Sequence, residues 1–398
     1  MIRILELFAG IGACSKALEN LGIEHEIVDA VEIDKYAIQA FNAIHGTNFE
    51  PQDICKWDKD IECDLIMHGS PCQDFSIAGK QAGGDKNSGT RSSLMYETLR
   101  IVEKLKPKYV IWENVKNILS EKHRHNFEAY CHEMAVLGYS NYAQVLNAKD
   151  YGVPQNRERV FTVSILGDGK YKLLEPIPLE KRLKDVLEEN VDEKYYLSDE
   201  QVASFVASTK KAEAKGNGFK FEPFERERER GIAHTIATRA GSRQTDNFIK
   251  ELSAESRRSM TSTSTNAFME QTDWRQQSVQ GTTAQRFCLP VKTANRKGFD
   301  MAIDGDGVDL AYPNSKTRRG RVGHEVSKTL PTSDSQGVLD GFRIRKLTPR
   351  ECYRLMGFDD ASFDRASAVL SNTQLYKTAG NSIVVNVLEA ILKELLCN

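Results

Sequence analysis

A cysteine thiol stands in an unusual local setting at Cys72. The run GSPCQDFS at 69–76 follows the apolar stretch DLIMH, so Cys72 lies in a Gly/Ser/Pro loop directly after a predicted strand. A partly exposed polar setting favours the thiolate, which is the nucleophilic form of cysteine. Most cysteines in proteins are structural, but this setting favours a catalytic nucleophile.

Further charged residues follow other apolar runs. Glu113 comes at the end of YVIWENV, and Arg157 and Arg159 lie in QNRER, directly before VFTVSIL. Residues i and i+2 share one face of an extended chain, so the two arginines are expected to point the same way. Each of these residues alone reads as a solvated surface group. Together with Cys72 they indicate a nucleophile, a carboxylate and positive groups at one site.

A glycine-rich turn predicts a ligand site near the N-terminus. LFAGIG at 7–12 joins a predicted strand to a predicted helix, which lets a ligand approach the backbone closely. Glu32 ends the next strand, where a carboxylate can accept both hydroxyls of a ribose. Asp53 is expected to close a third strand and to face an adenine amino group. A third glycine of the dinucleotide motif is missing, so S-adenosylmethionine is the leading candidate.

The predicted site residues can act together only in a fold that brings the ends of their strands close to one another. Apolar runs at 2–9, 26–33, 64–69, 109–115 and 158–166 alternate with helical patterns at 14–22, 35–45 and 93–105. Strands that alternate with helices indicate an α/β fold with a mostly parallel sheet and helices on both faces. Carboxyl ends of parallel strands meet at one edge, where such a fold binds its ligands.

Chain length, net charge and cysteine content limit the classes to which this protein can belong. A chain of 398 residues exceeds the size at which one core stops growing, so a second, smaller domain is expected in the polar, irregular stretch after 169. The net charge of −2 neither supports nor excludes DNA. Eight cysteines without a Cys-x-x-Cys pair argue against a zinc site and against a secreted framework. No signal peptide or membrane span is predicted, and a cytoplasmic location is expected.

The order of these motifs and the residues that form them resemble those of the bacterial and phage DNA (cytosine-5) methyltransferases. LFAGIG, GSPCQDFS, ENV, QNRER and the late AGNSIVVNV all follow the family's order, and the resemblance covers about 1–166 and 340–398. Ala13 and Cys14 depart from it, because many members carry a further glycine after Gly12.

The resemblance implies a role for each matched residue. Cys72 would be the nucleophile, Glu113 would hold and protonate N3 of a flipped cytosine, Arg159 would bind its O2, and Arg157 would support the loop. The residues implied to line the S-adenosyl-L-methionine site are Phe8, Ala9, Gly10, Gly12, Glu32, Ile33, Asp53, Ile54, Pro71, Leu94, Asn381 and Ser382. The loop from Ser76 to Arg91 would close over the base, and no metal is implied.

Three segments are expected. Residues 1–169 and 341–398 would together form a Rossmann-like, S-adenosylmethionine-binding catalytic domain. Residues 170–340 would form a smaller, irregular target recognition domain that reads double-stranded DNA. The basic run SKTRRGRVGH at 315–324 is the best candidate for a DNA-facing element, with a solvated loop nearly as plausible. A monomer is expected, and a cognate restriction endonuclease that acts on the same site remains an open option.

Other readings compete with this one. A tRNA-modifying cytosine methyltransferase shares the catalytic motifs, but the Cys-Phe-Thr tripeptide of that branch is missing here. An amino-methyltransferase would carry a Pro-Pro-aromatic loop, where this chain has Ser-Pro-Cys. A DNA-binding regulator that kept the fold without catalysis is opposed by the intact Cys72, Glu113 and Arg159.

Overall fold

The computed structural model describes residues 1–71, 94–181, 183–195, 288–293, 299–303, 306–309, 322–324, 326–328, 336–340 and 343–397. Cys72, the loop to Arg91 and most of 170–340 lie outside these ranges, so the predictions made for them stay predictions. The chain divides into two compact units. The first is formed by Met1–Lys181 and Pro349–Asn398, and the second by Arg182–Lys328 and Asp334–Thr348.

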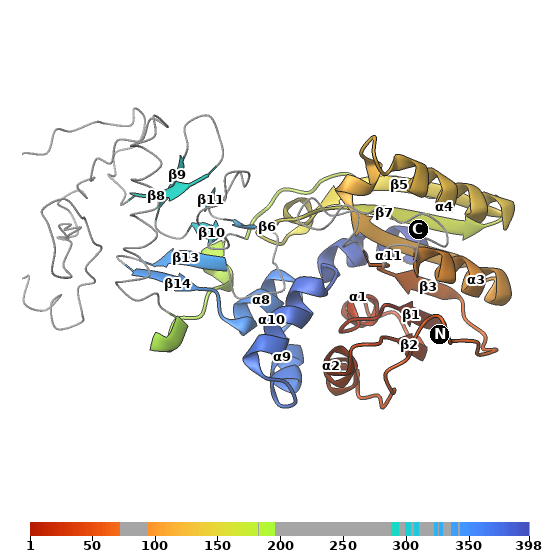
Figure 1. The fold of residues 1–398 in the computed structure, drawn as a ribbon, viewed down its shortest axis with the longest axis horizontal. Helices are drawn as coiled ribbons and strands as arrows, with labels where there is room; N and C mark the ends of the chain where they lie inside the picture. Colours follow the sequence, from red (N-terminus) through yellow and green to blue (C-terminus); the bar gives the residue numbers. More distant parts are fainter. Residues whose placement is uncertain are drawn as a thin grey trace, which may run out of the picture. The chain divides into compact units, whose positions relative to one another are not determined.

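A six-stranded sheet forms the centre of the first unit (Figure 1). Its strands are β1 (Ile2–Leu7), β2 (His25–Val31), β3 (Leu65–His68), β4 (Tyr109–Val115), β5 (Tyr139–Asn147) and β7 (Glu158–Leu166). They lie in the order β2-β1-β3-β4-β7-β5, and the first four run parallel. β7 is antiparallel to both of its neighbours. The carboxyl ends of β1, β2, β3 and β4 therefore meet at one edge.

Helices cover both faces of this sheet because its strands alternate their side chains. Leu5 and Leu7 of β1 belong to a core that includes Met95 and Tyr130. Those two residues come from α3 (Met95–Leu105) and α4 (Arg124–Val136), which lie together over one face in Figure 1. Glu6 points to the other face, where α1 (Ala13–Asn20) packs beside α11 (Val385–Cys397). This α/β architecture confirms the predicted fold class.

Glu6 of β1 carries a carboxyl group that is buried on the face of the sheet covered by α1. It is 3% exposed and accepts hydrogen bonds from the backbone N–H of Ser15, at 3.0 Å, and from the Ser15 hydroxyl. Burial raises the pKa of Glu6 to about 7. The two bonds from Ser15 fasten the first turn of α1 to β1, directly after the glycine-rich turn.

The C-terminal segment returns to the first unit through two lysine-to-aspartate pairs. Lys16 of α1 is 2% exposed and binds Asp359, the N-cap of α9 (Asp360–Ser367), at 2.8 Å. Lys377 of α10 (Asn372–Asn381) binds Asp34, the N-cap of α2 (Lys35–His45), at 2.6 Å. Each aspartate also accepts a backbone N–H of the helix that it caps. Both ends of the chain thus build one unit.

The second unit is described in part. β10 (Gly307–Asp309), β11 (Val322–Gly323), β13 (Gln336–Asp340) and β14 (Arg343–Lys346) form an antiparallel sheet in the order β11-β10-β13-β14. β8 (Cys288–Lys292) pairs with β9 (Phe299–Ile303). From the basic run at 315–324 only 322–324 are described, and His324 Nδ1 lies 2.8 Å from the buried Asp306 carboxylate.

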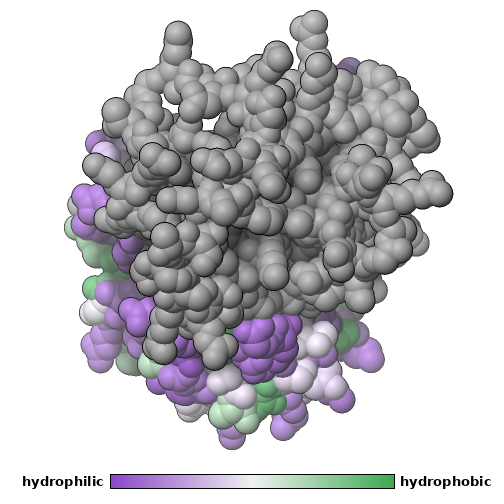
Figure 2. Space-filling view, turned by 90° about the vertical axis from the view of Figure 1, so that its left-hand side faces the viewer, coloured by the Kyte–Doolittle hydropathy of each residue, from purple (hydrophilic) through white to green (hydrophobic). Residues whose placement is uncertain are grey.

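The remaining elements are short. They are β6 (Gln155–Asn156), β12 (Ser327–Lys328), α8 (Pro349–Leu355) and the 3-10 turns η2 (Lys116–Leu119), η3 (Ala148–Tyr151), η4 (Leu183–Val186) and η5 (Glu193–Tyr195). Among the helices that the structure describes, none has the length and apolar character needed to cross a bilayer. On the face shown in Figure 2, the described surface is mainly hydrophilic, and its hydrophobic residues are scattered.

Candidate active site

The turn after β1 has the strained backbone that a close ligand approach requires. Phe8 has a φ of 54°, which is uncommon for a residue with a side chain, and Gly10 and Gly12 have φ values of 58° and 79°. Among the described residues, no atom lies within 4 Å of the place that a Cβ on Gly10 would take. The backbone of this turn is therefore open to a ligand at Gly10.

His45 supports the same turn from α2. Its Nε2 lies 3.1 Å from the carbonyl oxygen of Ile11, and a Cβ on Gly12 would stand 2.1 Å from that nitrogen. Burial lowers the pKa of His45 to about 4, so the ring is neutral near pH 7 and donates its Nε2 proton to Ile11. The packing of His45 thus demands glycine at position 12.

Glu32 follows the end of β2 and points its carboxylate at the turn. One oxygen accepts the N–H of Gly10 at 3.1 Å, and the other accepts the N–H of Asp34 at 2.8 Å. Burial raises the pKa of Glu32. Its neighbour Ile33 is 72% exposed, which is unusual for a large apolar side chain and leaves an apolar surface beside the carboxylate. Glu32 and Ile33 therefore offer a hydrogen-bonding group and an apolar face side by side.

The predicted strand that would end at Asp53 is wrong. Asp53 lies in a loop between α2 and β3. Pro51 has no N–H to give to a sheet, and among the described residues the one backbone bond of Gln52 runs from its N–H to the Glu32 carbonyl, at 2.8 Å. That bond still brings Asp53 beside Glu32. Asp53 uses one carboxylate oxygen to accept the N–H of Cys55 at 3.0 Å. Ile54 is 5% exposed and belongs to the core under the sheet.

Two side chains hold the chain that leads to Cys72. Trp112 donates its indole N–H to the Ser70 hydroxyl at 3.0 Å, and Asn114 Nδ2 lies 3.5 Å from both the Ser70 carbonyl and hydroxyl oxygens. Behind them, His68 stacks on Trp112 and shares a hydrogen bond with the Tyr130 hydroxyl. Burial lowers the pKa of His68 to about 3. The strand end at Gly69–Pro71 is thus fastened to β4.

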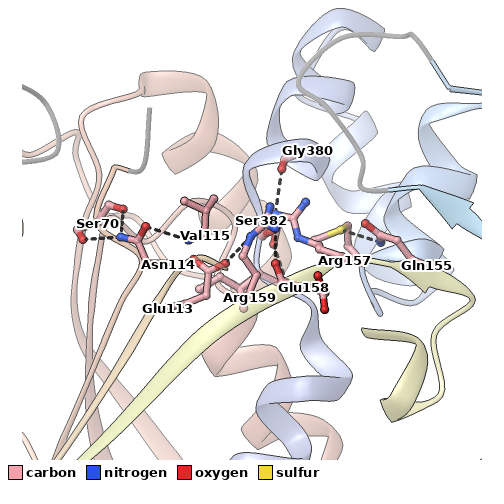
Figure 3. A network of polar contacts seen from close by, with 12 residues as sticks. Ser70, Glu113, Asn114, Val115, Gln155, Arg157, Glu158, Arg159, Gly380 and Ser382 are labelled. Carbon is pink, nitrogen blue, oxygen red and sulfur yellow. Dashed lines mark hydrogen bonds and ion pairs between the residues drawn. The ribbon is translucent and has the colours of Figure 1, made fainter. Parts of the chain in front are cut away.

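Glu113 and Arg159 form an ion pair at this strand end (Figure 3). Arg159 Nε lies 3.0 Å from a Glu113 oxygen, and their side chains are 17% and 11% exposed. β4 and β7 are antiparallel here, so the two residues come from neighbouring strands. The other Glu113 oxygen is 3.6 Å from the place of a Cβ on Gly69. Glu113 therefore lies against the strand that continues to Cys72.

Arg157 is oriented differently from Arg159. Its guanidinium donates to the Ser382 carbonyl at 2.9 Å and to the Gly380 carbonyl at 3.3 Å, at the end of α10 (Figure 3). A cation at a helix C-terminus is favourable, because the last carbonyls have no partner within the helix. Ile383, the next residue, lies 3.4 Å from the place of a Cβ on Gly69. Arg157 thus fixes the Asn381–Ser382 segment near the strand end of β3.

The structure gathers most of the predicted site residues at one edge of the sheet. Phe8, Ala9, Gly10, Gly12, Glu32, Ile33, Asp53, Ile54, Pro71, Glu113, Arg159 and Ser382 all follow or flank the carboxyl ends of β1 to β4. Leu94 precedes α3 and packs against the core. Cys72 itself lies outside the described residues. The contributions of His45, Ser70 and Trp112 were not predicted, although Trp112 stands beside Glu113 in the sequence.

The chain matches the family described as C-5 cytosine-specific DNA methylase over residues 2–397. The chain belongs to this family. An orphan methyltransferase of Bacillus phage SPR, M.SPRI, is 33% identical, over 99% of this chain and 97% of its own. The type II methyltransferase M2.ScrFI of Lactococcus lactis subsp. cremoris is 30% identical over 99% of each chain. A solved methyltransferase of Entamoeba histolytica shares the fold with a TM-score of 0.56 and 16% identity, over 100% of this chain and 98% of its own.

Membership confirms the predicted resemblance and the predicted activity. The protein is a DNA cytosine-5 methyltransferase, so the amino-methyltransferase reading and the regulator reading are set aside. A methyltransferase of this family needs a methyl donor and acts on DNA. The open turn at Gly10, the Glu32 carboxylate and the exposed Ile33 fit a donor with a ribose and an apolar ring.

Proposed function

We propose that this methyltransferase binds S-adenosylmethionine at the edge formed by Gly10, Glu32 and Asp53 and methylates carbon 5 of a cytosine flipped out of duplex DNA. Cys72 forms a transient covalent bond to that cytosine. The observation that supports this most is the Glu113–Arg159 ion pair beside Gly69, three residues before Cys72. An acid and a cation at one strand end suit a ring on which negative charge develops.

The covalent step answers the low reactivity of cytosine. Carbon 5 of the aromatic ring is a poor nucleophile, so the Cys72 thiolate first adds to carbon 6 and turns carbon 5 into an enamine-like carbon. That carbon forms a bond to the methyl group of the donor, whose sulfonium sulfur keeps the electrons of the broken bond and leaves as a neutral thioether. A base then removes the proton from carbon 5, the electron pair re-forms the ring double bond, and the Cys72 thiolate leaves. A stacked base cannot reach the thiol, which is why the cytosine has to leave the duplex.

Glu113 and Arg159 lower the barrier of the first addition. Glu113 takes up a proton from solvent as the base enters, holds N3 of the ring and passes this proton to it as negative charge builds there. Arg159 donates to O2 in the manner of an oxyanion hole. The 3.0 Å ion pair keeps both groups in place before the base arrives, so little reorganisation is needed at the moment of reaction. Arg157 contributes through the Asn381–Ser382 segment that it holds.

S-adenosylmethionine supplies an electrophilic methyl group on a sulfonium. The chain binds and orients it: the Glu32 carboxylate accepts the ribose hydroxyls, Ile33 and Ile54 flank the adenine, and Asp53 accepts the adenine amino group with its second oxygen. The glycine-rich turn lies against the methionine part. The backbone of this turn has positive φ at Phe8 and Gly10, and the open space at Gly10 leaves room for that approach.

Glu32→Ala is expected to weaken binding of the methyl donor while the maximal rate changes much less. Two charge-assisted hydrogen bonds to the ribose are lost, at about 1.5–3 kcal/mol each before water compensates. The Kd measured by isothermal titration should rise roughly tenfold or more, since 1.4 kcal/mol corresponds to a factor of ten. Glu32→Gln keeps one acceptor, so its Kd for the methyl donor should lie between those of the wild type and of Glu32→Ala. Unchanged affinity in the alanine variant would reject this assignment.

We infer that 170–340 carries target recognition. Polar Arg, Gln, Asn and Ser side chains, which are frequent in this segment, are the types that read base edges in the major groove. Replacing the segment by that of a relative should change the methylated sequence and leave cofactor affinity intact, because base reading and chemistry reside in different parts of the chain. A hybrid that folds and still methylates the original sites would place recognition elsewhere.

Transfer of a labelled methyl group tests the proposal as a whole. Duplex DNA should accept the label and tRNA should not, and bisulfite sequencing of a plasmid carried with the gene should locate one repeated target sequence. Label on tRNA alone would favour the tRNA-modifying alternative. A cytoplasmic location suits a thiolate nucleophile, since that compartment keeps thiols reduced. A restriction endonuclease that cuts the same target is a partner to seek next to the gene.

A further inference from the structure

Asp29 is a carboxylate buried in the middle of the edge strand β2. It is 1% exposed and accepts three side-chain hydrogen bonds. Gln52 Nε2 donates to one oxygen at 2.8 Å, whereas Trp57 Nε1, at 2.8 Å, and Lys59 Nζ, at 2.7 Å, both reach the other. All three donors come from one loop, between α2 and β3.

That loop carries Asp53 and Ile54, the residues assigned above to the adenine. Gln52 and Trp57 stand on either side of them in the sequence, so both flanks of the pair are fastened to a single carboxylate. Within the loop, the N–H of Trp57 donates to the Ile54 carbonyl at 3.3 Å. From outside it, Arg100 of α3 donates to the same carbonyl at 3.0 Å.

We infer that Asp29 is a positioning residue for adenine recognition: it holds the loop at 52–59 so that Asp53 faces the adenine amino group. This inference rests on the proposed cofactor site. Asp29 is buried under the loop, and it acts through the residues that the loop presents. The bonds from Lys59, Trp57 and Gln52 outweigh the effect of burial and lower the pKa of Asp29, so the carboxylate stays charged. A charged acceptor forms the stronger hydrogen bonds that a fixed loop needs.

A comparison of two ligands separates this role from a general structural one. S-adenosylhomocysteine carries the amino group that Asp53 would accept, and its inosine analogue carries an oxygen at the same place. The wild-type protein should bind the adenosine ligand more tightly. The quantity of interest is the ratio of the two Kd values, measured by isothermal titration with the full-length protein.

Asp29→Asn should raise the Kd for S-adenosylhomocysteine on the order of tenfold, because small displacements of positioned groups have effects of that size or larger. It should change the Kd for the inosine analogue much less, so that the ratio falls toward one. Trp57→Phe removes a single donor, keeps an aromatic ring and should lower the ratio partially. Thermal unfolding of each variant shows whether it is folded at the assay temperature.

Asp64→Asn is the matched control. Asp64 also accepts several hydrogen bonds, from the N–H and side chain of Arg3, but it lies at the opposite ends of the strands. The ratio of the Kd values for the two ligands in the Asp64→Asn variant should equal that of the wild type. If Asp29→Asn and Trp57→Phe raise both Kd values equally and leave the ratio unchanged, the inference is overturned. Asp53→Ala should abolish the preference by itself, and if it does not, the assignment of Asp53 in the proposed function is what fails.

Discussion

Cys72→Ser is expected to abolish covalent capture of duplex DNA that carries 5-fluorocytosine at the target. The wild-type protein should become trapped on this DNA only when S-adenosylmethionine is present. After Cys72 has added to carbon 6 and carbon 5 has taken the methyl group, release requires loss of the carbon-5 substituent as a cation. Hydrogen leaves in this way and fluorine does not, so the adduct persists.

The size of this effect follows from acid strength. A cysteine thiol has an ordinary pKa of about 8.5, whereas a serine hydroxyl is ionised far less at neutral pH. Methylation of ordinary DNA should therefore fall on the order of 10³-fold or more. DNA binding should survive. A denaturing gel gives the result: a heat-stable shifted band with Cys72→Ser would show that Cys72 is not the nucleophile.

Glu113→Gln is expected to slow trapping and methylation roughly 10²–10⁴-fold, the range over which a positioned proton donor contributes. The amide still reaches N3 but cannot supply a proton as charge builds on the ring. The substitution also removes the negative charge that pairs with Arg159. The nucleophile remains, so trapping should be slow but complete. Single-turnover assays with the fluorinated duplex measure the rate, and a gel shift measures the affinity for DNA, which should change little.

Glu158→Gln is the control for this variant. Glu158 neighbours Arg159 and pairs with Lys116 at 3.0 Å, but its side chain is 46% exposed. Exposed pairs contribute little to stability, so this substitution should leave the trapping rate near that of the wild type. Trapping by Glu113→Gln at the wild-type rate would remove Glu113 from the chemistry.

Residues at strand ends were the ones that the sequence could predict. Glu32 and Glu113 each follow an apolar run, and a chemically distinctive residue after such a run marks the edge where parallel strands meet. The structure places both there. The direction of β7 was beyond local reasoning, because an apolar run such as VFTVSIL reads the same in parallel and antiparallel sheets.

Partners that are distant in the sequence could not be predicted. Arg157 and Arg159 were expected to share a face, but the Arg157 guanidinium reaches carbonyls that follow more than two hundred positions later. Asp29 gave one local signal, a charge inside the apolar run EIVDAVEI, and the structure buries it. Its donors come from an irregular loop whose path no periodic pattern sets. The strand expected to end at Asp53 could not be judged from the local sequence: the structure has a loop there, in which the Gln52 N–H donates to the Glu32 carbonyl.

The two lysine-to-aspartate pairs bear on how this protein emerges from the ribosome. Lys16 pairs with Asp359 and Asp34 with Lys377, and each pair spans 343 positions of the chain. At about 5–20 residues per second, synthesis takes roughly twenty to seventy seconds to pass from the first partner to the second. During that time α1 and α2, with the glycine-rich turn between β1 and α1, lack the C-terminal helices that cover them. The first unit is completed only after Lys377 has been synthesised, and the nascent chain must keep its apolar helix faces from aggregating until then.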